Sequence, residues 1–145
     1  MSNQEFDWKK FQKRLGYSDE EVEHFRSDPH RAKAAKKIFS PDIVNKCLIF
    51  EVVESHGCSA NMKKGDRLYF RALSILDTKR SCPWCAHAMG FIPAIANMVQ
   101  DRYVAGIDPN EMIYNHTSCM DVGCKNGWGQ ISMKAYVVDE KDIKE

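Results

Sequence analysis

One short apolar stretch decides the fold, and it reads Cys47-Leu48-Ile49-Phe50-Glu51-Val52-Val53. Its β-branched and aromatic residues favour a strand over a helix. Leu48, Phe50 and Val52 occupy alternate positions, so they fall on one face of that strand. Cys47 lies inside the strand and away from turn-forming residues, which predicts an inert thiol in the core.

Three further strands, one of them short, are predicted downstream of this stretch. A turn-forming sequence at residues 63–66 precedes residues 67–73, whose composition is strand-like. Residues 130–138 alternate well and predict another strand of the same antiparallel sheet, and residues 112–114 predict a short additional strand. The apolar side of residues 130–138 consists of Ile131, Met133, Ala135 and Val137.

The longest helix is predicted between these strands, over about residues 83–104. Apolar side chains recur there every three or four residues, which gives a stripe suited to packing on the sheet. Pro93 falls inside this range and is expected to bend or split the helix. The stripe consists of Met89, Ile92, Ile95 and Val99.

The N-terminal part of the chain predicts three short helices. Gly16 is suited to end the first helix, and the sequence Ser18-x-x-Glu21 is typical of the start of the next. Asp28-Pro29 is suited to begin a third helix, because Asp is a good cap and Pro is tolerated in the first turn.

These patterns divide the 145-residue chain into an N-terminal helical extension, residues 1–41, and a cysteine-containing α+β domain, residues 42–145. The predicted fold class is α+β, with a small antiparallel sheet packed against one long central helix. The 21 Lys and Arg residues balance the 20 Asp and Glu residues, which argues against nucleic-acid binding. No apolar run is long enough to span a membrane, and the first ten residues are too polar for a signal peptide. We therefore expect a cytoplasmic protein that binds neither nucleic acid nor a membrane.

Five of the six cysteines fall in three short patches at the ends of predicted elements. Structural disulfides are rare in the cytoplasm, so clustered thiols there favour metal or redox chemistry. A C-x2-C pair and a C-x4-C pair together offer enough sulfurs for one tetrahedral site, and zinc and iron–sulfur clusters both accept such ligands. The sequence therefore predicts a zinc or iron–sulfur site whose ligands come from Cys58, Cys82, Cys85, Cys119 and Cys124.

The sequence leaves open which four of these five cysteines bind the metal. His56, His87 or His116 can replace one of them, although each is more often a hydrogen-bonding neighbour than a ligand. A set of buried thiols with no ligand role is the simpler alternative.

A redox function is the other alternative, because Cys82-Pro83-Trp84-Cys85 is typical of a dithiol oxidoreductase when it begins a helix. Backbone N–H groups and the dipole at a helix N-terminus would favour thiolates at both cysteines. The preceding residues 75–80 are not a convincing buried strand, however, so the βαβ setting of such proteins is missing.

Four short motifs give the chain a resemblance to a known family, and they are Cys58, Lys64-Gly65-Asp66, Cys82-Pro83-Trp84 and Cys119-Met120-Asp121. With them the chain resembles a family of small uncharacterised prokaryotic proteins over about residues 47–138. The resemblance implies a compact α+β domain with a core of three cysteines, at positions 58, 82 and 119, to which the cysteines at 85 and 124 are additions. Residues 59–62 depart from the pattern of this family, in which a Gly-His sequence is expected at the same place.

Two functions are consistent with these patterns. The first is a metal-binding accessory protein or small subunit of a larger cytoplasmic enzyme, with Phe6, Trp8, Phe11 and Phe25 as a docking surface or as packing residues. The second is a stand-alone enzyme, either a metalloenzyme or a thiol-disulfide oxidoreductase. Self-association is a further expectation for its partners. Asp66 and Asp121 are predicted to cap turns more often than to transfer protons.

Overall fold

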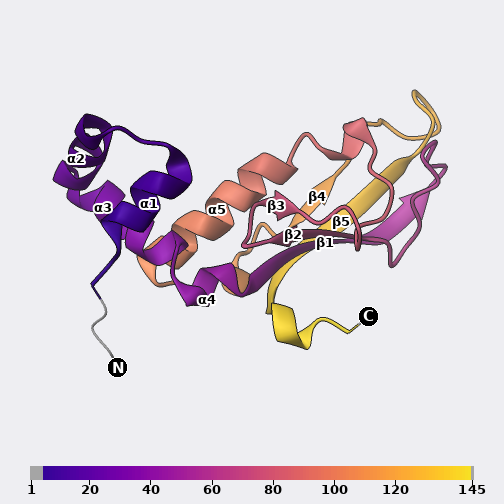
Figure 1. The fold of residues 1–145 in the computed structure, drawn as a ribbon. Helices are drawn as coiled ribbons and strands as arrows, with labels where there is room; N and C mark the ends of the chain where they lie inside the picture. The colour runs from indigo at the N-terminus through magenta and orange to yellow at the C-terminus, as the bar shows by residue number, and fades with distance from the viewer. Residues whose placement is uncertain (1–4, 145) are drawn as a thin grey trace.

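The computed structural model describes residues 5–144. The first four residues of the predicted extension and the last residue of the predicted α+β domain lie outside the described part. Within the described part the strands form one antiparallel sheet in the order β3-β2-β1-β5-β4. The long β1 lies at its centre and pairs with β2 on one side and β5 on the other (Figure 1). The strands are β1 (Lys46–His56), β2 (Arg67–Arg71), β3 (Ile75–Leu76), β4 (His116–Ser118) and β5 (Gln130–Asp139).

Three of the four strands expected from the sequence are confirmed, as β1, β2 and β5. Of the two short edge strands, β3 was not expected, and β4 lies at residues 116–118 and not at the predicted residues 112–114. Residues 112–114 are not a strand. The 3-10 helix Pro109–Glu111 precedes them, and Met112 points into the core with 4% exposure, whereas Ile113 is 86% exposed. The chain reaches the edge of β5 only at His116, where β4 begins.

The core lies between one face of the sheet and the helix α5 (Ile92–Ala105), which runs across that face (Figure 1). The predicted apolar face of β1 is confirmed, since Leu48, Phe50 and Val52 are all at most 1% exposed. The apolar side of β5 is buried as well. The fold is therefore α+β, with a small antiparallel sheet packed against one long helix.

The predicted start of the long helix was wrong by nine residues, because α5 begins at Ile92 and not at residue 83. Pro93 neither bends nor splits the helix, since it lies in the first turn, where its missing N–H has no helical partner to lose. Residues 82–91 are instead extended coil and the 3-10 helix Ala86–Ala88. Met89 is consequently 38% exposed and outside the buried stripe.

The N-terminal extension contains the three predicted helices, with the caps expected from the sequence, and a short fourth helix that was not predicted follows them. Gly16 ends the first with a left-handed φ of 72°, and Ser18 and Glu21 form the reciprocal capping hydrogen bonds of the second. Asp28 accepts hydrogen bonds from the first turn of the third. The helices are α1 (Trp8–Leu15), α2 (Asp19–Ser27), α3 (Pro29–Ile38) and α4 (Pro41–Val44).

The aromatic residues of the extension pack on one another, as one of the two expectations for them stated. Phe11, which is 4% exposed, is their centre, and its ring lies 5.3 to 5.8 Å from the rings around it. The helix α3 joins this group to the rest of the molecule through contacts with α5. The rings around Phe11 belong to Phe6, Trp8, Tyr17, Phe25 and Phe39.

The sheet face opposite α5 carries a group of three hydrogen-bonded side chains. Glu51 accepts hydrogen bonds from Tyr136 Oη at 2.7 Å and from Arg67 Nε at 2.8 Å. The Tyr136 hydrogen bond, followed by the Arg67 guanidinium, holds the pKa of Glu51 below its ordinary value. Burial, followed by the hydrogen bond to Glu51, raises the pKa of Tyr136 to about 12.

Replacing Tyr136 by Phe is expected to lower the free energy of unfolding by about 1.5 kcal/mol at neutral pH, because a hydrogen bond to a charged group is lost. Since the pKa of Glu51 is lowered in the folded state, its contribution is present above the ordinary carboxyl pKa and is lost as the pH falls through the folded value. The deficit of the variant should therefore shrink at about pH 3. Urea unfolding at both pH values measures this, and an unchanged deficit would contradict the assignment.

Candidate functional site

The segment of residues 82–91 crosses the end of the sheet and brings distant parts of the chain together. At its start, the Cys82 N–H donates a hydrogen bond to the Arg67 carbonyl at 2.9 Å, next to β2. Further along, the His87 carbonyl accepts from the Met120 N–H at 2.8 Å, next to the β4–β5 hairpin. Cys85 lies between these two attachment points, in front of the 3-10 helix.

Cys58 lies in the loop after β1, and a close contact between two glycines holds this loop in place. Gly57 has a φ of 64°, which favours glycine, and it lies against Gly129 at the start of β5. A methyl group on Gly129 would overlap backbone atoms of His56 and Gly57. The Cys58 carbonyl also accepts a hydrogen bond from the Asn61 N–H at 3.0 Å, which closes the loop.

Cys119 follows β4 and is the most buried of the five clustered cysteines, with 9% exposure. Its N–H donates to the Ile131 carbonyl at 3.1 Å, and its Sγ accepts from the Ile131 N–H at 3.3 Å. The hydrogen bond from the Ile131 N–H fixes the position of this sulfur beside β5.

These three segments enclose a cavity of about 10 Å³ at the end of the sheet. That volume holds roughly one water molecule or one ion, and it is far below the several hundred Å³ typical of pockets for organic ligands. The polar and sulfur-bearing side chains around it include those of Cys58, Cys85, Cys119, His87 and Asp121.

The other two predicted ligands do not line this cavity. Cys124 is exposed in the β4–β5 loop. Cys82 packs against the core, and burial, followed by the charge of Asp66, raises its pKa. The expectation that Cys82 and Cys85 lie at the N-terminus of a long α-helix was wrong, because only a 3-10 helix of three residues follows them.

Cys47 is the inert core thiol expected from the sequence. It is 0% exposed, and burial raises its pKa to about 11. It lies near the start of β1, whereas Cys58 follows the end of the same strand.

Of the three histidines considered as substitutes, only His87 lines the cavity. His56 pairs with Gln130 at the end of β1, and His116 Nδ1 lies 2.6 Å from Asn115 Oδ1. Among residues 5–144, no group of three or more His, Cys, Asp and Glu side chains stands ready to hold a metal ion.

The two aspartates of the motifs cap turns, as the sequence predicted. Asp66 accepts a hydrogen bond from the Lys63 N–H at 2.8 Å. Asp121 accepts from the N–H groups of Trp128 and Gly129, both at 3.2 Å. Although burial raises the pKa of Asp121, these backbone hydrogen bonds outweigh it and leave the pKa below its ordinary value. Both carboxylate oxygens of Asp121 therefore accept backbone hydrogen bonds within the hairpin that carries Cys119.

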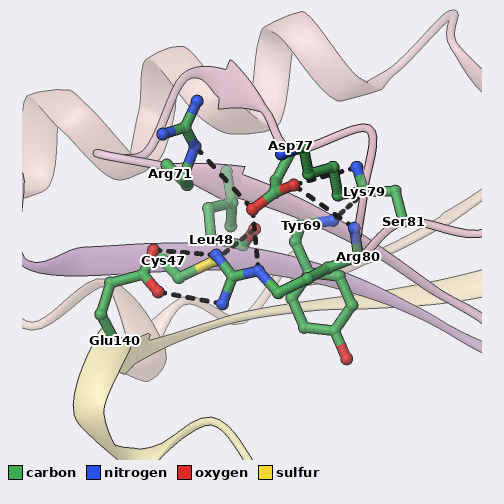
Figure 2. Close-up of polar contacts among 9 residues, drawn as sticks. All are labelled: Cys47, Leu48, Tyr69, Arg71, Asp77, Lys79, Arg80, Ser81 and Glu140. Atoms are coloured by element: carbon green, nitrogen blue, oxygen red, sulfur yellow. Dashed lines mark hydrogen bonds and ion pairs between the residues drawn. The ribbon is translucent and has the colours of Figure 1, made fainter. Parts of the chain in front are cut away.

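Sequence reasoning missed an arginine that positions the cysteine segment. Figure 2 shows the guanidinium of Arg80 between the carboxylates of Asp77 and Glu140. Its Nε donates to Asp77 at 2.8 Å, and its two Nη atoms donate to the two oxygens of Glu140 at 3.0 and 3.1 Å. The adjacent Ser81 accepts a hydrogen bond from the Tyr69 N–H at 2.9 Å, which anchors the chain just before the first cysteine of the segment.

Replacing Arg80 by Lys is expected to lower the free energy of unfolding by about 1 to 2 kcal/mol, because an ammonium cannot reproduce the forked contacts to two carboxylates. Arg71 is the matched control, since its Nε lies 3.9 Å from Asp77 and its side chain is 56% exposed. Arg71→Lys should lower the free energy of unfolding by less than about 0.5 kcal/mol. Equal losses in urea unfolding of the two variants would contradict the positioning role of Arg80.

Comparisons with known proteins found no match, since no family model, no curated protein and no solved structure matches this chain at a significant level. The resemblance to a family of small prokaryotic proteins therefore stays a prediction. Within residues 5–144, no helix combines the length and apolar character needed to cross a membrane.

Proposed function

We propose that this protein binds a single metal ion through Cys58, Cys85 and Cys119, and that it serves as a small accessory subunit of a larger cytoplasmic enzyme. The observation that carries this proposal is the shared cavity, because three thiols from three separate segments line it. Buried thiols with no ligand role would have no reason to lie around one cavity. The ligand set is not preformed among the described residues, so metal binding requires the side chains around the cavity to rearrange.

The proposed fourth ligand is His87, whose side chain lines the same cavity. Asp121 is less suitable because both of its oxygens already accept backbone hydrogen bonds. Three sulfurs and one imidazole nitrogen form a donor set that zinc accepts in tetrahedral geometry. The small cavity also favours one ion over an iron–sulfur cluster, which needs space for several metal and sulfide atoms.

Two observations favour metal binding over thiol-disulfide exchange. Cys85 lines the cavity but Cys82 does not, so the two cysteines of the C-P-W-C sequence point to different surroundings. The pKa of Cys82 is raised, which opposes the thiolate that an attacking cysteine requires.

The proposed accessory role is supported by exposed apolar side chains beside the cavity. Met120, Val122 and Trp128 belong to the same hairpin loop as Cys119 and are 61, 64 and 75% exposed. Trp84, which directly precedes Cys85, and Phe91, at the end of the same segment of residues 82–91, are 39 and 45% exposed. Apolar surface of this kind on a small protein is typical of a contact with a larger partner.

Metal and acid-labile sulfide analysis of anaerobically prepared protein tests the proposal. Wild type should carry one equivalent of zinc without sulfide, and serine variants of Cys58, Cys85 and Cys119 should each lose it. Cys124→Ser is the matched control, since this exposed cysteine lies outside the cavity, and it should keep the metal. Equimolar sulfide and iron with visible absorbance would assign a cluster instead. Metal retained in all three cavity variants would refute the site.

A further inference from the structure

A second cavity lies at the opposite end of the sheet, where β1 begins and β5 ends. Its volume is about 570 Å³, which is within the range of pockets that hold small organic molecules. It lies between α3, the C-terminal end of α5 and the loop that follows α5. Its charged and polar lining consists of Lys37, Lys46, Tyr103, Asp108, Asn110, Asp139 and Asp142.

The walls of this cavity are fixed by the fold. Gly106 ends α5 with a left-handed φ of 79°, and its N–H bonds back to the last turn of the helix. Asn110 then pins the loop to β5, because its Nδ2 donates to the Val137 carbonyl at 2.9 Å and its Oδ1 accepts from the Val137 N–H at 2.8 Å. Lys46 and Asp139, which face each other across β1 and β5, form an ion pair of 2.7 Å. A ligand would therefore meet a preformed site.

The lining offers both free donors and free acceptors. Among the side-chain hydrogen bonds of residues 5–144, none involves the Lys37 ammonium, the Tyr103 hydroxyl or the Asp142 carboxylate. Lys37 has only a long ion pair of 4.0 Å, to the exposed Asp42. The Lys37 ammonium and the Asp142 carboxylate thus lie on different elements around the cavity, on α3 and on the 3-10 helix Glu140–Asp142 that follows β5.

We infer that this cavity binds a small zwitterion, an amino acid or a short peptide, with the ligand carboxylate at Lys37 and Tyr103 and its ammonium at Asp142. A purely anionic ligand would face three aspartates, and a purely cationic one would face two lysines. A ligand with both charges matches both walls, and its backbone can lie against the apolar side chains of Ile107 and Val137. This inference does not depend on the metal site.

Titration of the ¹⁵N-labelled full chain with triglycine, followed by amide chemical shifts, tests the inference. Triglycine carries both terminal charges, N-acetyltriglycine carries only the carboxylate, and triglycinamide carries only the ammonium. Saturable shifts at Tyr103, Gly106 and Asp142 are expected for triglycine, with binding at least tenfold weaker for both blocked peptides.

Two variants and one control complete the test. Lys37→Met and Asp142→Asn should each weaken triglycine binding by about tenfold, as loss of one charged hydrogen bond predicts. Lys33→Met is the control, because Lys33 is an exposed residue of the same helix that does not line the cavity, and it should bind as wild type does. The inference is overturned by blocked peptides that bind equally well, by shifts confined to other regions, or by no saturable shift up to about 10 mM triglycine.

Discussion

Replacing Gly129 by Ala is expected to lower the free energy of unfolding by about 3 kcal/mol, the upper range for overpacking a tight contact. The added methyl group would overlap the backbone of His56 and Gly57, and backbone atoms cannot move aside as a flexible side chain can. The loop that carries Cys58 would have to shift away from β5. We therefore expect the variant to lose bound metal as well as stability.

Gly90→Ala is the matched control for this change. Gly90 has no positive φ, and a methyl group there would meet only the Met120 side chain, at 3.4 Å. A change of less than about 0.5 kcal/mol is expected, as for an ordinary surface substitution. Urea unfolding and metal analysis of both variants measure the outcome. A Gly129→Ala protein with wild-type stability and metal content would show that the contact between the two loops does not hold the site together.

Removing the metal is expected to lower the free energy of unfolding by about 4 kcal/mol when the free metal concentration is about 1,000 times its Kd. The apo protein should nevertheless stay folded. Its core lies between the sheet and α5, with Phe50, Leu68 and Met133 all at 0% exposure, and these residues do not line the small cavity. The cavity loops should loosen while the central strands remain.

Thermal unfolding with added zinc and with a chelator measures this effect. The chelator should lower the Tm of wild type and of Cys124→Ser, and should leave the lower Tm of Cys58→Ser unchanged. A chelator without effect on wild type that has first been shown to be zinc-loaded would contradict a contribution of the metal to folding.

Local signals explain why much of the fold was predictable. The alternation of Leu48, Phe50 and Val52 places a strand and also its buried face, because side chains of a strand point to opposite sides in turn. The caps at Ser18 and Asp28 involve residues only two or three positions apart, so the sequence itself contains both partners.

The start of α5 was not predictable in the same way. A proline is tolerated in the first turn of a helix, and both Pro83 and Pro93 are consistent with that position. Contacts with residues distant in sequence determine which proline begins the helix. Residues 82–91 are hydrogen-bonded to Arg67 at one end and to Met120 further along. The segment is not an α-helix where it makes both contacts.

The candidate site was also predictable only in part, because some of its contacts are local in sequence and others are not. Cys58, Cys85 and Cys119 were among the predicted ligands, and the structure places all three at one cavity. Cys124 follows Cys119 closely in sequence, but the hairpin turns it into solvent. Arg80 was missed because one of its partners, Glu140, is sixty residues away and no local pattern links them.

X-ray absorption at the zinc edge of the zinc-loaded protein tests whether three cysteines share one metal ion, because it counts the sulfur neighbours of the metal. Convergence of Cys58, Cys85 and Cys119 with His87 predicts three sulfur atoms at about 2.3 Å and one nitrogen at about 2.0 Å. A first shell that contains only oxygen and nitrogen atoms, or one sulfur at most, would contradict the account.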